Sequence, residues 1–138
     1  MSTAFEASLP GTPLSVRMLR HEMAGMAEDC GMDAEGIADV MLAVTEAATN
    51  AVIHAYAEKQ GELRVTAGVQ DGELAIVIGD TGPGLVRRDD SPGLGIGLAV
   101  MANASERLRV VSHAGGTEVH MAFPCANADP SRRDVICQ

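Results

Sequence analysis

The chain has 138 residues and carries 19 acidic against 10 basic side chains, which gives a formal net charge of −9 at pH 7. This length predicts one domain that buries a core without a disulfide or a structural metal. The acidic excess argues against direct binding to nucleic acid or to an anionic membrane surface, because both need a basic patch. The aromatic residues, Phe5, Tyr56 and Phe123, are too few to form a stacking platform for bases.

The cysteines indicate a reducing compartment. Cys30, Cys125 and Cys137 are an odd number without metal-ligand spacing, and no disulfide framework is visible. The first residues contain no long apolar run, and later apolar stretches are too short to cross a bilayer. We therefore expect a cytoplasmic protein without a signal peptide.

The chain opens with a predicted strand and helix. Residues Thr3 to Leu9 alternate between apolar and polar and stop at Pro10-Gly11, which predicts a short strand closed by a turn. Thr12-Pro13 supplies a helix cap followed by a proline at the first helical position, and the helix is predicted to continue to about Cys30.

A second helix is predicted from about Ala34 to Tyr56, with Asp33 as its cap. Apolar residues fall within an arc of roughly 120° on a helical wheel, which predicts the side that faces the core. These residues are Ile37, Val40, Met41, Val44, Ala48, Ala51, Val52 and Ala55.

A polar stripe on the same helix repeats every four residues as Glu46, Asn50 and His54, bordered by Ala43 and Ala47. An ordinary solvated face is one interpretation, but such faces usually carry lysine or arginine, and this helix contains neither. A carboxylate can take a proton or hold a hydroxyl group, and an amide oxygen can ligate a hard cation. The stripe therefore predicts a recess suited to phosphate and magnesium chemistry.

Two hairpins follow. Leu63 to Val69 alternates as a strand with one wet face, and Asp71-Gly72 is a strong hairpin signal. The return strand, Leu74 to Ile78, is almost continuously apolar, which predicts burial on both faces near the middle of a sheet. The second hairpin is predicted after a short helix from about Leu98 to Ser105, with strands Leu108 to Ser112 and Glu118 to Phe123.

This order of elements predicts an α+β fold, a two-layer sandwich with helices on one face of a mixed, mostly antiparallel sheet. We expect the domain to span residues 1–124. Residues 125–138 lack periodicity and are expected to form a flexible tail.

Two glycine-rich segments suggest a phosphate site. Asp80 and Thr81 precede Gly82-Pro83-Gly84 directly after the apolar strand, and Gly93-Leu94-Gly95-Ile96-Gly97 leads into a helix. Backbone N–H groups at such a helix N-terminus can hold phosphate oxygens. The spacing does not match a dinucleotide-binding fingerprint or a P-loop. Asp80 could accept a hydrogen bond from an exocyclic amino group such as that of adenine, or simply cap the turn at Gly82.

The order of these motifs resembles the GHKL ATPase superfamily, and Val44 to Tyr56 looks like the N-box of the anti-sigma-factor serine/threonine kinases. The resemblance covers roughly Phe5 to Phe123 and implies a Bergerat-type ATP-binding fold with ATP and Mg²⁺ as cofactors. The segment Val86 to Pro92 is much shorter than the ATP lid of many relatives, and the helix after Gly97 has no basic residue before Arg107.

The resemblance also implies a role for each site residue. Glu46 would be the catalytic base, Asn50 the Mg²⁺ ligand and Asp80 the adenine contact. Thr117 would support the adenine site, and His54 would be structural. The glycine segments would bind the nucleotide through Gly82, Gly84, Gly93, Leu94, Gly95, Ile96 and Gly97.

The activity implied is transfer of the ATP γ-phosphoryl group to a Ser or Thr of an anti-anti-sigma protein, alternating with sequestration of a sigma factor. Family members of this type dimerise, and the first strand and helix would be the natural surface. Two alternatives stay open: a non-catalytic, nucleotide-gated binding module, and a detached histidine-kinase catalytic domain. His21-Glu22 is like a histidine-kinase phosphoacceptor dipeptide, but a partly exposed structural histidine is the favoured interpretation.

Overall fold

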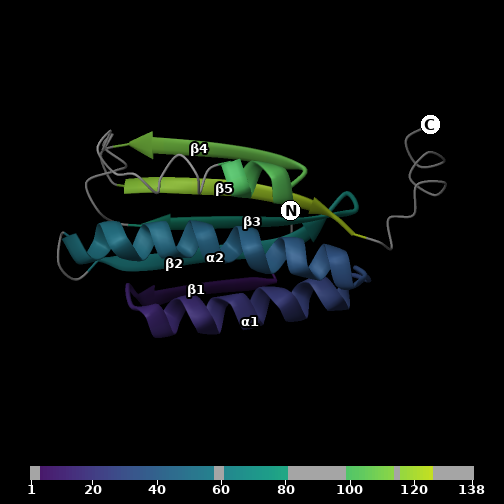
Figure 1. Ribbon diagram of the computed structural model, residues 1–138, viewed down its shortest axis with the longest axis horizontal. Helices are drawn as coiled ribbons and strands as arrows, with labels where there is room; N and C mark the ends of the chain where they lie inside the picture. Colours follow the sequence, from purple (N-terminus) through teal and green to yellow (C-terminus); the bar gives the residue numbers. More distant parts are fainter. Residues whose placement is uncertain (1–3, 58–60, 81–98, 114–115, 126–138) are drawn as a thin grey trace.

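The computed structural model describes residues 4–57, 61–80, 99–113 and 116–125. Two long helices precede most of the sheet, and residues 99–104 form a further helical segment. The elements are β1 (Phe5–Pro10), α1 (Pro13–Asp29), α2 (Ala34–Ala57), β2 (Glu62–Gln70), β3 (Glu73–Asp80), β4 (Arg107–His113) and β5 (Gly116–Pro124). Figure 1 shows α1 and α2 lying side by side over one face of the sheet, which confirms the expected two-layer α+β fold.

The five strands are ordered β1-β2-β3-β5-β4, with β3 in the middle as predicted. Every pairing between these described strands is antiparallel, so the expected mixed sheet is corrected to an antiparallel one. The reason is that β2–β3 and β4–β5 are hairpins, and the second hairpin joins β3 through its returning strand.

Among the described residues, helices cover only one face of the sheet. Along β3, Leu74, Ile76 and Ile78 are buried beneath the helices, whereas Ala75 and Val77 on the opposite face are half-buried. The prediction that this strand is buried on both faces was therefore wrong, because α1 and α2 cover the same side of the sheet.

Local signals place the turns and helix ends where the sequence predicted them. The Thr12 hydroxyl accepts a hydrogen bond from the Ser15 N–H, and Asp33 Oδ1 accepts one from the Gly36 N–H at 2.9 Å. The hairpin turn between β2 and β3 has positive φ at both Asp71 (53°) and Gly72 (78°), the geometry that an Asp-Gly turn favours.

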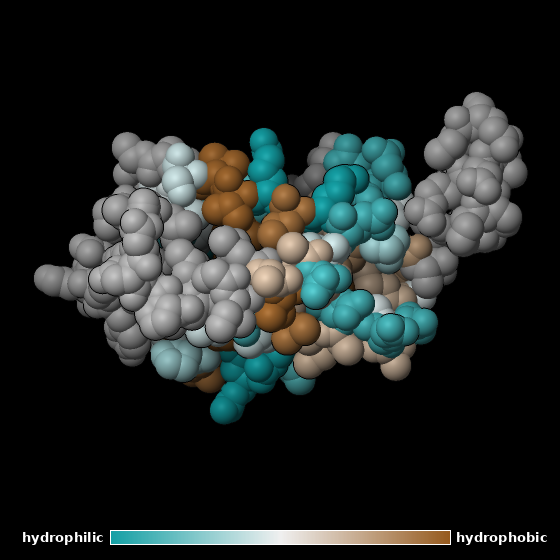
Figure 2. All heavy atoms as spheres, turned by 45° about the horizontal axis from the view of Figure 1, so that its top comes forward, coloured by the Kyte–Doolittle hydropathy of each residue, from teal (hydrophilic) through white to brown (hydrophobic). Residues whose placement is uncertain are grey.

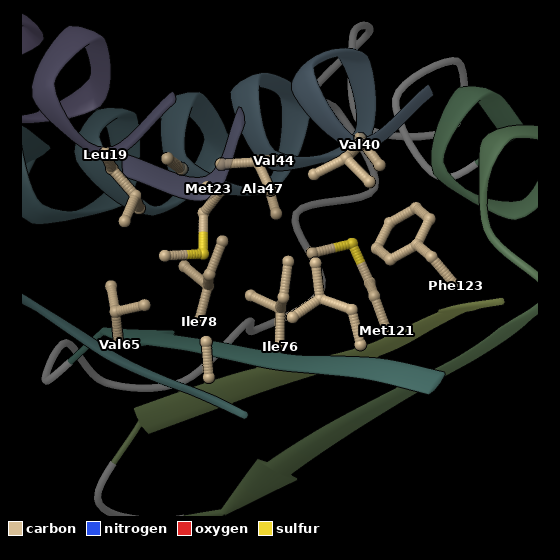
Figure 3. Close-up of a cluster of buried hydrophobic side chains, with 14 of the residues drawn as sticks. Leu19, Met23, Val40, Val44, Ala47, Val65, Ile76, Ile78, Met121 and Phe123 are labelled. Atoms are coloured by element: carbon tan, nitrogen blue, oxygen red, sulfur yellow. The ribbon is translucent and has the colours of Figure 1, made fainter. Parts of the chain in front are cut away.

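The core lies between α2, α1 and the buried face of the sheet, as Figure 3 shows. The predicted core stripe of α2 is confirmed at Val40, Val44, Ala48, Ala51 and Val52. Ile37 is partly buried against this core and Met41 is half-buried.

Ala43 and Ala47, which the sequence suggested as the border of an open recess, are instead part of the core at 0% and 3% exposure. The arc that α2 buries is wider than the apolar pattern indicates, because the helix has neighbours on two sides, α1 and the sheet. Seen from the helix side with the β4 edge turned forward, hydrophobic and hydrophilic side chains are mixed over the described surface (Figure 2).

Two free cysteines meet at the edge of this core. Cys30, the C-cap of α1, and Cys125, directly after β5, are both buried, and their thiols are neighbours. The Cys125 N–H also donates to the Gly72 carbonyl at 2.8 Å. Cys125 therefore belongs to the folded body, not to the expected tail; residues 126–138 lie outside the described chain.

Burial and the neighbouring Cys125 thiol raise the pKa of the Cys30 thiol from 9.0 to about 12. Because the folded-state pKa lies above that of the unfolded chain, the stabilisation is complete below about pH 9 and is lost as the pH rises towards 12. We expect the free energy of unfolding, measured by urea titration across this interval, to fall more steeply for the wild type than for Cys30→Ala. Equal slopes for the two proteins would contradict this expectation.

Candidate functional site

A buried carboxylate lies at the end of the central strand. Asp80 is the last residue of β3 and is 6% exposed. It pairs with Leu63 on β2 and with Thr117 on β5, on the face of the sheet that carries the helices. A charged group is rarely buried this deeply without a structural or functional partner, so Asp80 marks this end of the sheet as a candidate site.

Thr117 lies beside Asp80 and continues the polar region across β5. Its side chain is buried at 5% exposure, and its hydroxyl oxygen lies 3.4 Å from that of Ser112 on the edge strand β4. The structure therefore brings together two of the predicted site residues, Asp80 and Thr117, at the end of an otherwise apolar sheet face.

Gly116 is a site residue that the sequence indicated only as part of a turn. It begins β5 with φ +141°, and a Cβ atom there would collide with the carbonyl oxygen of Asp80. Any side chain at this position would push β5 away from the carboxylate. The sequence signal was the pair Gly115-Gly116 before Thr117, but its steric role depends on β3, which is remote in the chain.

Glu46 and Asn50 lie one turn apart on α2, and both are half-exposed. This exposure distinguishes them from Ala43 and Ala47, which are buried in the core. In Figure 1 the C-terminal half of α2, the end of β3 and the start of β5 all lie at the same end of the molecule. Glu46 lies at the middle of α2, and Asn50 lies one turn nearer to that end.

The remaining predicted residues lie outside the part of the chain that the structure describes. Gly82, Gly84 and the segment from Gly93 to Gly97, with Leu94 and Ile96, fall within residues 81–98, and the side chain of His54 is not described either. Their predicted contacts with phosphate remain predictions.

A magnesium ion fits this donor set only together with a phosphate. Among the described residues, no three His, Cys, Asp or Glu side chains are grouped closely enough to form a metal site by themselves. Mg²⁺ usually keeps few protein ligands and takes the rest from phosphate and water, which suits one amide oxygen from Asn50. Within the same residues, no helix is both long and apolar enough to cross a bilayer.

Comparisons with known proteins agree with this geometry. The family described as histidine kinase-like ATPase domain matches residues 9–123. The serine-protein kinase RsbW of Bacillus licheniformis is 34% identical over 128 residues, 81% of this chain and 80% of that protein. The anti-sigma F factor of Clostridium acetobutylicum is 34% identical over 114 residues, 74% of this chain and 80% of that protein.

A solved structure supports the same fold. The chain that holds the RsbU and RsbW domains of Rv1364c from Mycobacterium tuberculosis matches with a TM-score of 0.70 at 25% identity. The match covers 90% of this chain and 32% of that one, so the present chain spans about a third of that larger protein.

We expect Gly116→Ala to lower the free energy of unfolding by about 2 kcal/mol or more, because the new methyl group meets the Asp80 carbonyl at a positive φ. Gly25→Ala is the matched control, since a Cβ at this position on α1 has nothing within 4 Å. Denaturant titration of both variants checks the prediction, and a wild-type midpoint for Gly116→Ala would contradict it.

Proposed function

This chain belongs to the histidine kinase-like ATPase domain family, and we propose that it is an ATP-dependent serine/threonine kinase that acts as an anti-sigma factor. In this proposal it phosphorylates a Ser or Thr of an anti-anti-sigma protein and otherwise sequesters a sigma factor. The names of its relatives, serine-protein kinase and anti-sigma F factor, support both parts. Action on such partners would take place in the cytoplasm. The family resemblance also implies that the protein is a homodimer.

The observation that carries the proposal is the buried carboxylate of Asp80 beside Thr117, at the end of the molecule that also holds the C-terminal half of α2. A buried carboxylate accepts hydrogen bonds from N–H donors strongly, which suits the amino group of adenine. The chain has few aromatic residues, so a hydrogen-bond contact of this kind would supply the selectivity that base stacking supplies elsewhere.

In the proposed chemistry, the helix layer and the sheet contribute different groups. When bound, Mg²⁺-ATP supplies the γ-phosphoryl group for transfer. The Glu46 carboxylate orients the acceptor hydroxyl and takes its proton, while the Asn50 amide oxygen is available to hold the cation. Asp80, supported by Thr117, holds the base at the opposite end of the nucleotide. The family's catalysis would then rest on positioning and charge neutralisation.

The glycine segments complete the proposal. Gly82 and Gly84 would form the floor beneath the base, and Gly93 to Gly97 would present backbone N–H groups to the phosphates.

We expect Glu46→Gln to reduce phosphoryl transfer at least about 100-fold, because the amide cannot take a proton, with ATP affinity within about threefold of the wild type. The assay uses labelled ATP, Mg²⁺ and a candidate anti-anti-sigma protein, and follows acid-stable label on Ser or Thr. Glu35→Gln, in the first turn of the same helix, is the control and should transfer normally.

The same assay separates the alternatives. Tight ATP binding without transfer by the wild type would favour a nucleotide-gated binding module, whereas acid-labile label would favour a histidine-kinase domain. Full transfer by Glu46→Gln would contradict its role as the base.

We expect Asp80→Asn to weaken ATP binding by about 10- to 100-fold, the usual cost of losing a hydrogen bond to a charged group. Titration calorimetry with ATP in the presence of Mg²⁺ measures the change, and a thermal melt checks that the variant is folded. Asp29→Asn, at the exposed C-terminal end of α1, should bind ATP as the wild type does. Unchanged binding by Asp80→Asn would contradict the placement of adenine.

A further inference from the structure

A pocket of about 320 Å³ lies between the C-terminal half of α1, the start of β1 and the end of β2. Phe5, Met26 and Val69 give this pocket apolar walls, and Val69 is still 44% exposed. Glu22 and Asp29 of α1 add two carboxylates to the lining. The pocket therefore suits a segment that is both apolar and positively charged.

The negative charge at this end of α1 has no partner among the described residues. Asp29 is the last residue of α1, and the last turn of the helix contains no basic residue. The carbonyl groups at a helix C-terminus carry a partial negative charge, so a cation is favoured there and an anion is not. Neither Glu22 nor Asp29 forms an ion pair within the described part of the chain. A cation supplied from elsewhere would offset both carboxylates and the helix end.

The described chain leaves the sheet beside this pocket. Cys125 follows β5, and its thiol is a neighbour of the thiol of Cys30, a residue that lines the pocket. The Cys125 N–H donates to the Gly72 carbonyl, in the turn that follows β2. Figure 1 shows the end of β5 and the C-terminal end of α1 at the same end of the molecule. The residues after Cys125 therefore start next to the pocket.

The sequence that follows Cys125 carries the matching chemistry. Arg132 and Arg133 are followed, after one aspartate, by Val135 and Ile136. The seven residues from Cys125 to Arg132 can span up to about 23 Å, which exceeds the width of a helix, about 10 Å. Attachment through so short a connection gives an effective concentration in roughly the millimolar range, so weak contacts are sufficient for docking.

We propose that residues 126–138 of this chain dock in the pocket, with Val135 and Ile136 against its apolar walls and the two arginines beside its carboxylates. The docked segment would cover Val69 and offset the negative end of α1. The sequence alone predicted a flexible tail here, but that prediction did not include the partners that the pocket supplies.

Charge selects this occupant over the other segment that adjoins the pocket. Residues 1–3 precede Ala4, which also lines the pocket, but they contain no basic side chain. The pocket is also remote from the nucleotide site, because β5 begins beside Asp80 and ends at Cys125. The inference therefore goes beyond the proposed function and does not rest on it.

Methyl nuclear magnetic resonance of the full chain, with labelled isoleucine, valine and methionine, tests the proposal. We expect nuclear Overhauser contacts between the methyl groups of Ile136 and Met26. Val69→Lys should abolish them, because the lysine removes an apolar wall and repels the arginines. Trypsin cleavage after Arg132 or Arg133, followed by mass spectrometry, should then be at least about fivefold faster than in the wild type, since cleavage follows the undocked population.

Leu14→Lys is the matched control. Leu14 is 61% exposed in the first turn of α1, at the end of the helix remote from the pocket, so the variant should retain both the contacts and the cleavage rate. A charge exchange adds a second test. Glu22→Arg combined with Asp29→Arg should release the segment, and adding Arg132→Glu with Arg133→Glu should restore the Overhauser contacts. Thermal melts confirm that each variant is folded.

Three results would overturn the proposal: no contact between Ile136 and the pocket in the wild type, an unchanged cleavage rate for Val69→Lys, or no recovery after the charge exchange. Contacts from residues 1–3 in place of Ile136 would assign the pocket to those residues and reject this one. Contacts seen only between chains, in a mixture of labelled and unlabelled protein, would assign it to a second copy and likewise reject docking within one chain. ATP binding and phosphoryl transfer are measured separately, so failure of the kinase proposal leaves this test unaffected.

Discussion

The close packing of α2 on the sheet is the constraint on which the rest of the structure depends. Ala43, Ala47, Ala48 and Ala51 are all buried, and small side chains let the helix backbone approach its neighbours closely. A larger residue at any of these positions would lift the helix and move Glu46 and Asn50 with it. The buried alanines therefore determine the position of Glu46 and Asn50.

In the sheet, the polar groups are positioned by the fixed register of two paired strands, β3 and β5. Asp80 and Thr117 are directly paired, and glycine at position 116 allows the two strands to come together at that point. Loss of the glycine would move the two groups apart, although neither group itself would be changed. In both layers, residues without a functional group, alanine in the helix and glycine in the sheet, fix the position of the polar side chains.

The sequence alone predicted most of this architecture, because many of its signals are local. The Asp71-Gly72 turn, the caps at Thr12 and Asp33 and the extent of α2 depend on residues within one or two turns of each other. The errors concern neighbours that are remote in the chain. Contacts between residues that are distant in the sequence determine the second covered side of α2, the open face of β3 and the neighbours of Cys125. For the site, Asp80 and Thr117 were named from motif order, whereas the steric need for Gly116 became visible only with β3 beside it.

The register of β1 has a consequence for synthesis on the ribosome. Phe5 pairs with Ala67, so the first strand to emerge has no partner until both helices and most of β2 have been made. The helical hairpin can form early from local contacts, while β1 must remain unattached during that time. β1 therefore waits only for β2, whereas β3, β5 and β4 are added on the other side of β2, so the two edges of the sheet are completed at different times.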